Sequence, residues 1–401
     1  MTDATNNEPV TRTGSGHGAS LINNPKFRAV IYQAAMLLGV VLLIWWLQSN
    51  AAYNLGQQNK SIGFGFLNST SGFQIGFSLL PYERASTYFD VYLVGIVNTL
   101  LVASIGIVLA TMLGFTIGIA RLSPNWILRK LAMVYVEVMR NIPLLLQLFF
   151  WYFLLLNALP AVRDSYALGD LVFLNQRGLY LPAIVSDGRF LIVVAGFLIA
   201  LGAAIWFRRR TIKKIEETGD RKPIWLPMIA IFAVIFAIAY FGSGAPVELD
   251  FPELRGFNYA GGFQVPPELT ALILGLVIYT SAFIAEVVRA GIQSVSYGQV
   301  EAAEALGLRE SDRMRLVVIP QAMRVIVPPL TSQYLNLTKN SSLGAAIGFP
   351  ELVSVFAGTA LNQSGRAIEI IALTMAVYLT FSLLTSIFMN WYNARVALVE
   401  R

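Results

Sequence analysis

Long runs of apolar residues, separated by short polar stretches, dominate this chain. A helix needs about 20 apolar residues to cross the roughly 30 Å of hydrocarbon in a bilayer, and runs of that length recur along most of the sequence. They predict an all-α integral membrane protein with about eight transmembrane helices. One run, which follows Pro328, is interrupted, and its ends are the least defined. The predicted spans are residues 28–48, 91–120, 131–157, 190–207, 224–242, 267–292, 328–356 and 367–391.

The composition supports this class and removes several others. Of 401 residues, 56% are hydrophobic and 13% are charged, which is outside the range of water-soluble globular proteins. The chain has no cysteine, which excludes disulfides, thiol catalysis and cysteine metal sites. The single histidine, His17, lies in a Ser/Gly/Asn-rich tail where disorder is more common than a ligand role, so no metal site is predicted. A long polar tail precedes the first run, which therefore reads as a span and not as a cleavable signal peptide.

The distribution of basic residues predicts the orientation. Most of the 29 lysines and arginines fall on one side of the membrane if the N-terminus is inside, and such residues are retained in the cytoplasm. Both termini are therefore predicted to be cytoplasmic, and the net charge of +6 reflects topology and contact with anionic headgroups, not nucleic-acid binding. The predicted parts are a tail 1–26, a first transmembrane helix 27–48, an extracytoplasmic segment 49–90, a core part 91–157, inserted loops with a helical hairpin 158–266, a second core part 267–394 that contains a polar loop 293–327, and a tail 395–401. The charged turn of the hairpin is predicted to be a solvated inner connection, not a binding surface.

The loop 293–327 is polar, although apolar runs flank it. Its charges make insertion into lipid too costly, so it is predicted to lie in the cytoplasm. Helix-forming alanines favour a helix over 299–306, and Gly307 can take the left-handed conformation that ends it. A second helix is predicted to begin with Ser311 as its cap and to end at Pro320. Two short helices with a bend predict a plug that fits a groove on another protein.

The residues of this loop resemble a known motif. Glu301, Ala302 and Ala303, then Gly307, then a hydrophobic residue and Pro320, resemble the EAA loop of ABC importer permeases. In that family the loop forms coupling helices that dock into a cytoplasmic ATPase. The resemblance extends to the polar amino acid uptake subfamily through RNIPLLLQLFFWYF (140–153), AFIAEVVRAGIQSVSYGQVEAAEALGL (282–308) and LTKNSSLGAAIGFPEL (337–352).

The resemblance covers 91–157 and 267–391, and it implies the five-helix core of a type I ABC importer permease. The long segment after the first span and the extra inner hairpin depart from the short five-span members. They look like the larger permease subunits of general L-amino acid importers of Gram-negative bacteria.

This resemblance implies a permease subunit in the bacterial inner membrane, in an importer that is driven by ATP and depends on a binding protein. The chain has no Gly-x4-Gly-Lys-Ser/Thr phosphate-binding loop, so ATP and Mg are expected on a separate ATPase dimer, with no cofactor in this chain. The other implied partners are a periplasmic solute-binding protein, an L-amino acid substrate, membrane lipid and a second, paralogous permease subunit, although a homodimer remains an alternative. No nucleic acid is expected.

Charge inside a span is costly and usually faces a cavity or another charge, and four of the charged residues in predicted spans stand out. Glu137 and Arg140 are three residues apart and so share a helix face, as do Glu286 and Arg289. One interpretation is that they line or gate the cytoplasmic half of the substrate pathway. The alternative is that Glu137 pairs with Arg289, and Arg140 with Glu286, only to neutralise charge near the inner interface.

Lys339, Asn340, Ser341 and Ser342 are candidate substrate contacts. They lie in the interrupted run, where a broken helix exposes backbone groups inside the membrane. The α-carboxylate of an amino acid needs a positive or N–H-rich pocket, which a helix start beside Lys339 would provide. The alternative is that Lys339 satisfies carbonyl groups at a helix end.

A rival function is an ion- or proton-coupled secondary amino acid transporter. It requires a titratable carboxylate inside a span, and Glu286 is the candidate, although it lies near the inner end. Secondary transporters are commonly built from two related halves, and the chain shows no convincing internal repeat. A membrane enzyme is disfavoured because no cysteine, span-associated histidine or clustered metal-ligating carboxylates occur.

Overall fold

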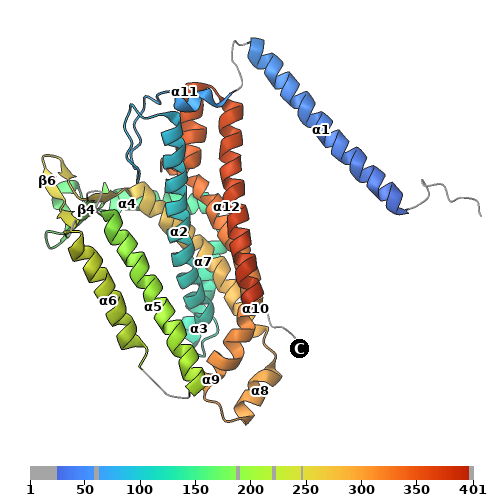
Figure 1. Cartoon of the computed structure of the whole chain (residues 1–401), viewed down its shortest axis with the longest axis vertical. Helices are drawn as coiled ribbons and strands as arrows, with labels where there is room; N and C mark the ends of the chain where they lie inside the picture. Colours follow the sequence, from blue (N-terminus) through green and yellow to red (C-terminus); the bar gives the residue numbers. More distant parts are fainter. Residues whose placement is uncertain (1–24, 58–62, 187–189, 219–222, 245–246, 397–401) are drawn as a thin grey trace, which may run out of the picture. The chain divides into compact units, whose positions relative to one another are not determined.

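The computed structural model divides the chain into two compact units, Met1–Phe66 and Leu67–Arg401. It describes all residues except 1–24, 58–62, 187–189, 219–222, 245–246 and 397–401 (Figure 1). His17 and most of the two predicted tails therefore lie outside the described residues.

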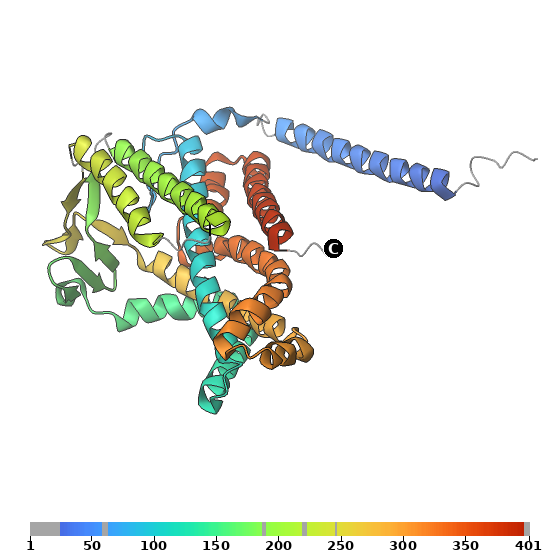
Figure 2. The ribbon, with the colours of Figure 1, turned by 60° about the horizontal axis from the view of Figure 1, so that its bottom comes forward.

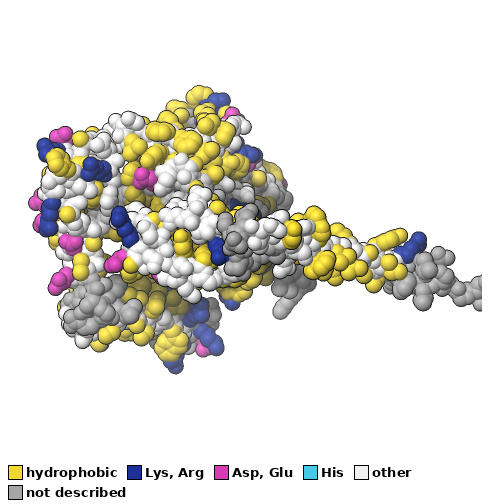
Figure 3. Space-filling model, turned by 90° about the horizontal axis from the view of Figure 1, so that it is seen from above, with side chains coloured by type: hydrophobic (Ala, Val, Ile, Leu, Met, Phe, Trp, Pro, Cys, Tyr) yellow, Lys and Arg dark blue, Asp and Glu magenta, His cyan; other side chains and the backbone are white. Residues whose placement is uncertain are grey.

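One long helix, α1 (Pro25–Gln57), makes up most of the described part of the first unit. Its segment Arg28–Asn50 has 23 residues and a mean hydropathy of 2.2, which is enough to cross a bilayer. Side chains of this segment are exposed on every face, and most are hydrophobic (Figure 3). The first predicted span is confirmed, and the helix continues into the part predicted as an extracytoplasmic segment. A short 3₁₀ helix, η2 (Phe64–Asn68), follows.

Two long helices, α2 (Tyr88–Ala120) and α7 (Pro267–Gln293), pack along each other in the second unit (Figures 1 and 2). Glycines on α2 allow the close approach: a Cβ on Gly114 would lie 2.6 Å from the Cβ of Ile284. Small residues at helix contacts are favoured in membranes because packing, not water exclusion, holds helices together there. The predicted spans over both helices are confirmed.

Local sequence sets where these two helices begin. Thr87 Oγ1 accepts a hydrogen bond from Asp90 N at 3.3 Å, and Asp90 Oδ2 accepts one from Thr87 N at 2.8 Å. This reciprocal arrangement satisfies two backbone donors that the start of α2 would otherwise leave without partners. Helix α7 starts at Pro267. Proline suits this position because it has no N–H, and an N–H in the first turn of a helix would have no helical acceptor.

The predicted span 131–157 is not one helix. It consists of α3 (Trp126–Asn141) and α4 (Leu144–Ala158), which are bent by 106°. The cause is Pro143, because a proline ring disfavours the helical conformation of the residue before it. Ile142 accordingly has φ −92° and ψ 128°. A single continuous helix was therefore the wrong expectation, although the bent pair together is apolar enough to form one span.

The predicted hairpin consists of α5 (Phe190–Thr218) and α6 (Trp225–Gly242), which lie side by side in both ribbon views (Figures 1 and 2). A Cβ on Gly196 of α5 would lie 2.1 Å from the Cβ of Ala239 on α6, so the two backbones are in close contact. Helix α5 extends well beyond the predicted span 190–207, through the basic residues that follow it.

Short antiparallel strands fold the segments on either side of this hairpin, which were predicted only as outward loops. A four-stranded sheet has the order β1-β2-β3-β8 and so joins the two segments. β4 pairs with β5 where the chain enters and leaves the hairpin. β-Branched and aromatic residues, which suit strands, recur in these short segments. The strands are β1 (Tyr166–Leu168), β2 (Val172–Asn175), β3 (Gly178–Leu181), β4 (Ala183–Ser186), β5 (Val247–Asp250), β6 (Glu253–Arg255), β7 (Asn258–Ala260) and β8 (Phe263–Val265).

The polar loop after α7 is helical, but its second half differs from the prediction. Arg309, not Ser311, is the N-cap of the second short helix. Pro320 lies in the first turn of the next helix and does not end one, because a first-turn proline lacks only a donor that would be unpaired there. The elements are α8 (Tyr297–Ala305), α9 (Glu310–Arg313), a π-helical turn η4 (Met314–Val318) and α10 (Ile319–Asn340).

The predicted run 328–356 is interrupted as expected, but not at its prolines. Helix α10 continues through Pro328 and Pro329, and the regular α-helix ends only at Asn340. Gly348, at φ +80°, ends the 3₁₀ segment that follows. The remaining elements are η5 (Ser341–Ile347), π-helical η6 (Val353–Ala360), α11 (Leu361–Ser364) and α12 (Ala367–Val396), the last of which confirms the final span.

The fold is mostly helical, as predicted. Among the described residues, six helices are long and apolar enough to cross a membrane, or seven if α3 and α4 form one span. The prediction of about eight spans counted the run 328–356, which the structure divides between α10 and short irregular helices. The buried core draws on α2, α4, α7, α10 and the segment after it; it includes Leu148, Leu272, Leu276, Ile326 and Phe349.

Candidate functional site

The polar elbow, residues 297–313, has a well-defined bend between α8 and α9. Gly307 has φ +74°, its N–H donates to Glu304 O at 2.8 Å, and the N–H of Leu308 donates to Ala303 O at 3.2 Å. This pair of bonds is the Schellman arrangement, in which a left-handed glycine closes a helix and satisfies its last carbonyls. The predicted end of the first helix at Gly307 is confirmed.

Both exposed and anchored residues occur on the elbow. Glu301 and Ala302 are exposed, whereas Ala303 is buried. Leu306, at 81% exposure, presents a large apolar side chain on a segment that carries many charges. Arg313 of α9 forms an ion pair with Glu304 of α8, which fixes the two short helices relative to each other. The elbow therefore offers a preformed surface of mixed apolar and acidic character to a partner.

Glu286 is the centre of an ion cluster between α2, α3 and α7. It pairs with Arg121 at the end of α2, with Arg289 one turn along α7 at 2.5 Å, and with Arg140 of α3 at 3.8 Å. Arg140 also lies over the Phe283 ring, 5.1 Å from its centroid. Three guanidinium groups thus converge on one carboxylate, and the cluster keeps an excess of positive charge.

Only part of the predicted ion pairing occurs. Arg140 reaches Glu286, but Glu137 is exposed and has no ion pair within 4.0 Å among the described residues. The suggested pairing of Glu137 with Arg289 is therefore wrong. Arg121 was missed because it follows a span at the inner end and was counted as a loop residue.

The structure places Lys339 in the last turn of α10 and not beside the start of an α-helix. A cation there interacts favourably with the negative end of the helix dipole. Ser342 Oγ donates to Lys339 O at 2.8 Å, and Ser341 Oγ donates to Thr338 O at 2.7 Å. Ser341 is fully buried and Asn340 is half-buried, so of these four residues Lys339 and Ser342 are the ones that reach an open cavity.

This cavity lies between the end of α10, η6 and α12. Its volume is about 400 Å³, within the range of small-ligand pockets. The lining surface is predominantly apolar, although the lining residues include one amino group and three hydroxyls. The residues are Lys339, Ser342, Val353, Thr374, Met375 and Tyr378.

A buried carboxylate that sequence reasoning missed lies behind this cavity. Glu351 is fully buried, and its oxygens accept hydrogen bonds from Val353 N at 2.8 Å and Ser354 N at 2.7 Å. Tyr378, which lines the cavity, donates to Glu351 Oε2 at 3.3 Å. A single acidic residue inside the apolar run GFPELVSVF was the available signal, because such a residue needs partners wherever it is buried.

Asn98 holds α2 to the same region. It is fully buried, and its Nδ2 donates to Phe77 O at 3.0 Å and Pro350 O at 2.8 Å. Thr99, next to it, accepts a hydrogen bond from Leu352 N at 3.1 Å. These contacts fix the irregular backbone on both sides of Glu351 against a regular helix, which is the condition under which non-helical segments persist at membrane depth.

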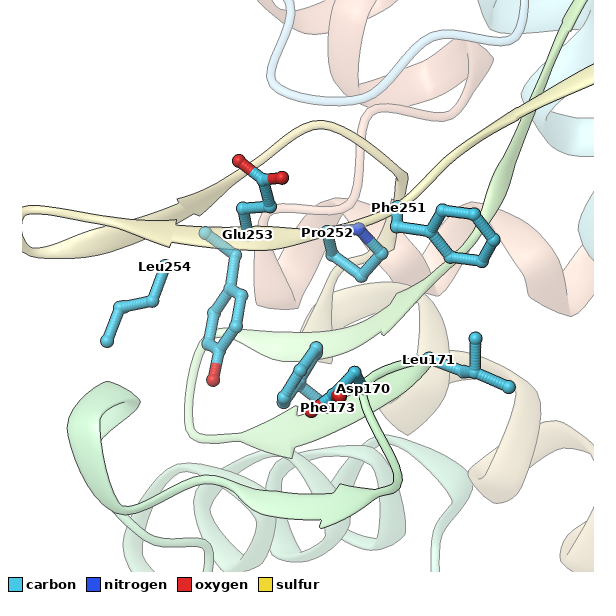
Figure 4. A pocket seen from close by; sticks show the side chains of 8 residues that line it. Asp170, Leu171, Phe173, Phe251, Pro252, Glu253 and Leu254 are labelled. Carbon is cyan, nitrogen blue, oxygen red and sulfur yellow. The ribbon is translucent and has the colours of Figure 1, made fainter.

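The short strands line a second cavity, of about 500 Å³ (Figure 4). The rings of Phe173 and Tyr259 stack there with centroids 4.5 Å apart. Beside the cavity, burial raises the pKa of the Tyr180 phenol, against the effect of its hydrogen bond to Asn258. Its lining residues include two carboxylates, Asp170 and Glu253, and no lysine or arginine, which distinguishes it from the cavity beside Lys339. Residues labelled in Figure 4 are Asp170, Leu171, Phe173, Phe251, Pro252, Glu253 and Leu254.

Several membrane helices around a core with buried polar groups, together with a polar elbow between two of the helices, define a membrane permease. Comparison with known proteins identifies the family. Residues 223–398 match the family described as "Binding-protein-dependent transport system inner membrane component". The chain is 48% identical to the putative amino-acid ABC transporter permease protein YhdX of Escherichia coli, over 97% of this chain and 99% of that protein.

Two further relatives match at full length. The general L-amino acid transport system permease protein AapQ of Rhizobium johnstonii is 48% identical over 100% of this chain and 99% of its own. The glutamate/glutamine/aspartate/asparagine transport system permease protein BztB of Rhodobacter capsulatus is 41% identical over 95% of this chain and 96% of its own.

The chain belongs to the amino-acid ABC transporter permeases. Members are integral inner-membrane subunits of ABC importers, in which a separate subunit hydrolyses ATP, and they work with an ATPase and a binding protein. The family expected from the EAA loop is therefore confirmed, and a secondary transporter is not favoured. The EAA motif and coupling helix are typical of this family.

Proposed function

We propose that this chain carries L-amino acids across the membrane by alternating access. A soluble binding protein delivers the substrate on the outer side, and ATP with Mg binds to a separate ATPase dimer on the inner side. The observation that carries this proposal is the elbow, whose Schellman bend presents Glu301, Ala302 and Leu306 to a partner. In this arrangement Ala303 and Gly307 shape the elbow, Pro320 lies in the first turn of the helix that leads away from it, and Glu301 and Ala302 contact the ATPase.

The proposed orientation places the elbow and both termini in the cytoplasm. Basic residues support it, since lysine and arginine accumulate in cytoplasmic segments. The elbow and the basic end of α5 lie toward the same end of the second unit in Figure 1, as this orientation requires. In this orientation the short strands β1–β8 lie on the outer side of the membrane, where the binding protein docks.

The proposed substrate contact is the cavity beside Lys339. Its ammonium group would bind the α-carboxylate of the amino acid. The hydroxyls of Ser342 and Tyr378 donate to Lys339 O and Glu351, so their oxygens would accept hydrogen bonds from the substrate. Asn340 and Ser341 lie between Lys339 and Ser342 in the chain, and their backbone positions these two lining residues. The cavity is open to the surface of this chain, which leaves room for a second, paralogous permease subunit to cover it. A second copy of this chain is the alternative partner.

The ion cluster at Glu286 is proposed to hold the inner end of the pathway closed. Arg121 and Arg140 come from α2 and α3, so the carboxylate links both helices to α7. Arg289 forms an ion pair with Glu286 within α7 itself. Separation of α3 from α7 would break this link, and Glu137, exposed one turn before Arg140, would then lie near the opening.

The test is ATP-dependent uptake of labelled L-amino acids into vesicles that contain the complete importer. Glu301→Lys and Leu306→Asp change exposed elbow residues, and each is expected to abolish uptake and ATPase co-purification while membrane insertion persists. Glu83→Lys is the matched control, because Glu83 is an equally exposed carboxylate on the segment before α2. Normal uptake in both elbow variants would contradict the coupling role, and uptake that an uncoupler abolishes while ATP is retained would favour the secondary transporter.

A further inference from the structure

The inner end of the α5–α6 hairpin contains a cavity that the sequence did not indicate. It has a volume of about 630 Å³ and lies between the last turns of α5 and the first turn of α6. Phe207 and Ile215 of α5 and Pro227 of α6 provide an apolar lining. The polar groups of the lining come from Thr211, Lys214, Glu217 and Thr218, so the cavity holds one carboxylate beside its one amino group. The predicted solvated connection is thus next to an amphipathic pocket.

Lys214 is the one cation in the lining, and the same turns of α5 carry further cations outside it. Only Lys213 forms an ion pair among the described residues, with Glu217 at 4.0 Å, and both partners are highly exposed. Lys214 has no ion pair among the described residues, and the neighbouring cations add a positive potential around the pocket that favours an anion. The cations on this part of α5 are Arg208, Arg209, Arg210, Lys213 and Lys214.

Aromatic residues place this pocket at the level of lipid headgroups. Trp206 on α5 and Trp225 on α6 are 60% and 67% exposed, and tryptophan accumulates at the membrane interface. The guanidinium of Arg210 lies 5.2 Å from the centre of the Trp206 ring. Above this level the exposed side chains of both helices are apolar, as expected of a lipid-facing surface. The cations therefore begin where the hydrocarbon ends.

We propose that this pocket binds an anionic phospholipid. The phosphate would lie against Lys214 and Arg210, and the glycerol and upper acyl chain against Phe207 and Ile215. A soluble phosphate would leave the apolar lining in contact with water, whereas a lipid covers it and extends onto the apolar surface of the hairpin. Basic pockets of this type at the cytoplasmic ends of membrane helices bind anionic headgroups. The inference requires only that the hairpin lies in a bilayer, and it does not depend on the proposed transport cycle.

The test measures binding of cardiolipin and phosphatidylglycerol to the full-length permease in nanodiscs of phosphatidylcholine. The variant Arg210→Gln/Lys214→Gln removes two cations at the pocket. The matched control, Arg129→Gln/Lys130→Gln, removes two cations from the first turns of α3. At about 1 kcal/mol for each cation near the headgroups, the pocket variant is expected to bind on the order of 25-fold more weakly, and the control is expected to bind like the unmodified chain.

A second variant tests whether the lipid occupies the pocket itself or is only attracted by the positive charge of the surrounding helix end. Thr211→Trp fills the pocket without a change of charge, so it is expected to displace the bound lipid while general attraction to anionic vesicles persists. Excess inorganic phosphate is expected to displace no bound lipid. Equal losses in the pocket and control variants, unchanged binding in Thr211→Trp, displacement by phosphate, or equal affinity for phosphatidylcholine would each overturn the proposal.

Discussion

Gly307→Ala tests whether the shape of the elbow matters, separately from its side chains. A Cβ at this position would meet no atom within 4 Å, so the substitution introduces no clash. Its whole effect comes from the backbone, because φ is +74° and a residue with a Cβ is disfavoured there. The two hydrogen bonds that close α8 depend on this conformation.

The expected magnitude follows from that conformational cost. A left-handed residue other than glycine costs about 1–2 kcal/mol. If the elbow must keep its bend to contact the ATPase, the same free energy is lost from the complex, and affinity falls roughly 5–30-fold. Gly307→Asn is expected to recover much of the loss, since asparagine adopts this conformation more readily than alanine.

The assay is the dissociation constant of the purified ATPase for permease in nanodiscs, with ATP-dependent uptake measured in parallel. Gly298→Ala is the matched control: Gly298 lies in α8, has no contact within 4 Å for an added Cβ, and does not have a positive φ. That substitution is expected to stabilise α8 slightly, by about 0.5–1 kcal/mol. If Gly298→Ala weakens ATPase binding as much as Gly307→Ala, or if Gly307→Ala binds normally, the bend has no role in docking.

Three further predictions concern the stability of the purified protein in detergent, measured as thermal unfolding. Glu351→Ala leaves two buried N–H groups without acceptors and is expected to cost about 1–3 kcal/mol for each, whereas Glu351→Gln keeps one oxygen and should cost less. Gly114→Ala forces α2 away from α7 and is expected to cost about 1–3 kcal/mol. Its control is Gly39→Ala in the interior of α1, which has no atom within 4 Å and is expected to stabilise slightly, by about 0.5–1 kcal/mol. Glu286→Gln leaves three guanidinium groups without their shared carboxylate, so stability should fall by about 1–3 kcal/mol and should recover partly at high salt.

Most of the helical framework could be predicted from the sequence, because apolar run length is a direct physical requirement of a bilayer. The end of α8 at Gly307 could also be predicted, since few residues other than glycine adopt the left-handed conformation. Prolines were harder to interpret. Pro143 bends the chain sharply, while Pro328 and Pro329 lie inside a continuous helix. The difference depends on tertiary neighbours that can satisfy the freed backbone groups, and a single sequence does not show these neighbours.

The polar contacts of the candidate site were predictable only in part. Glu286 and Arg289 are close in sequence, so their pairing on one face of α7 followed from helical spacing. Arg121 is 165 residues from Glu286, and no local pattern indicates that contact. Asn98 and Pro350 are 252 residues apart for the same reason. The outer strands were missed because they are three or four residues long, too short to show an alternating pattern.

The elbow is connected to both parts of the proposed pathway by continuous helical chain, and this connection provides a route for coupling. Toward the N-terminus it leads directly into α7, whose last turns carry Glu286 and its arginines. Toward the C-terminus it leads through η4 into α10, a helix of 22 residues that ends beside the Lys339 cavity. At 1.5 Å per residue, α10 is about 33 Å long, so this one helix, with Pro328 and Pro329 inside it, extends from the elbow to the cavity. The π-helical turn at 314–318 lies where such a helix would need to pivot, because π-turns interrupt regular helical bonding and often occur at functional positions. In this mechanism ATPase closure moves one segment, and the gate at Glu286 and the cavity at Lys339 respond together because both adjoin it in the chain.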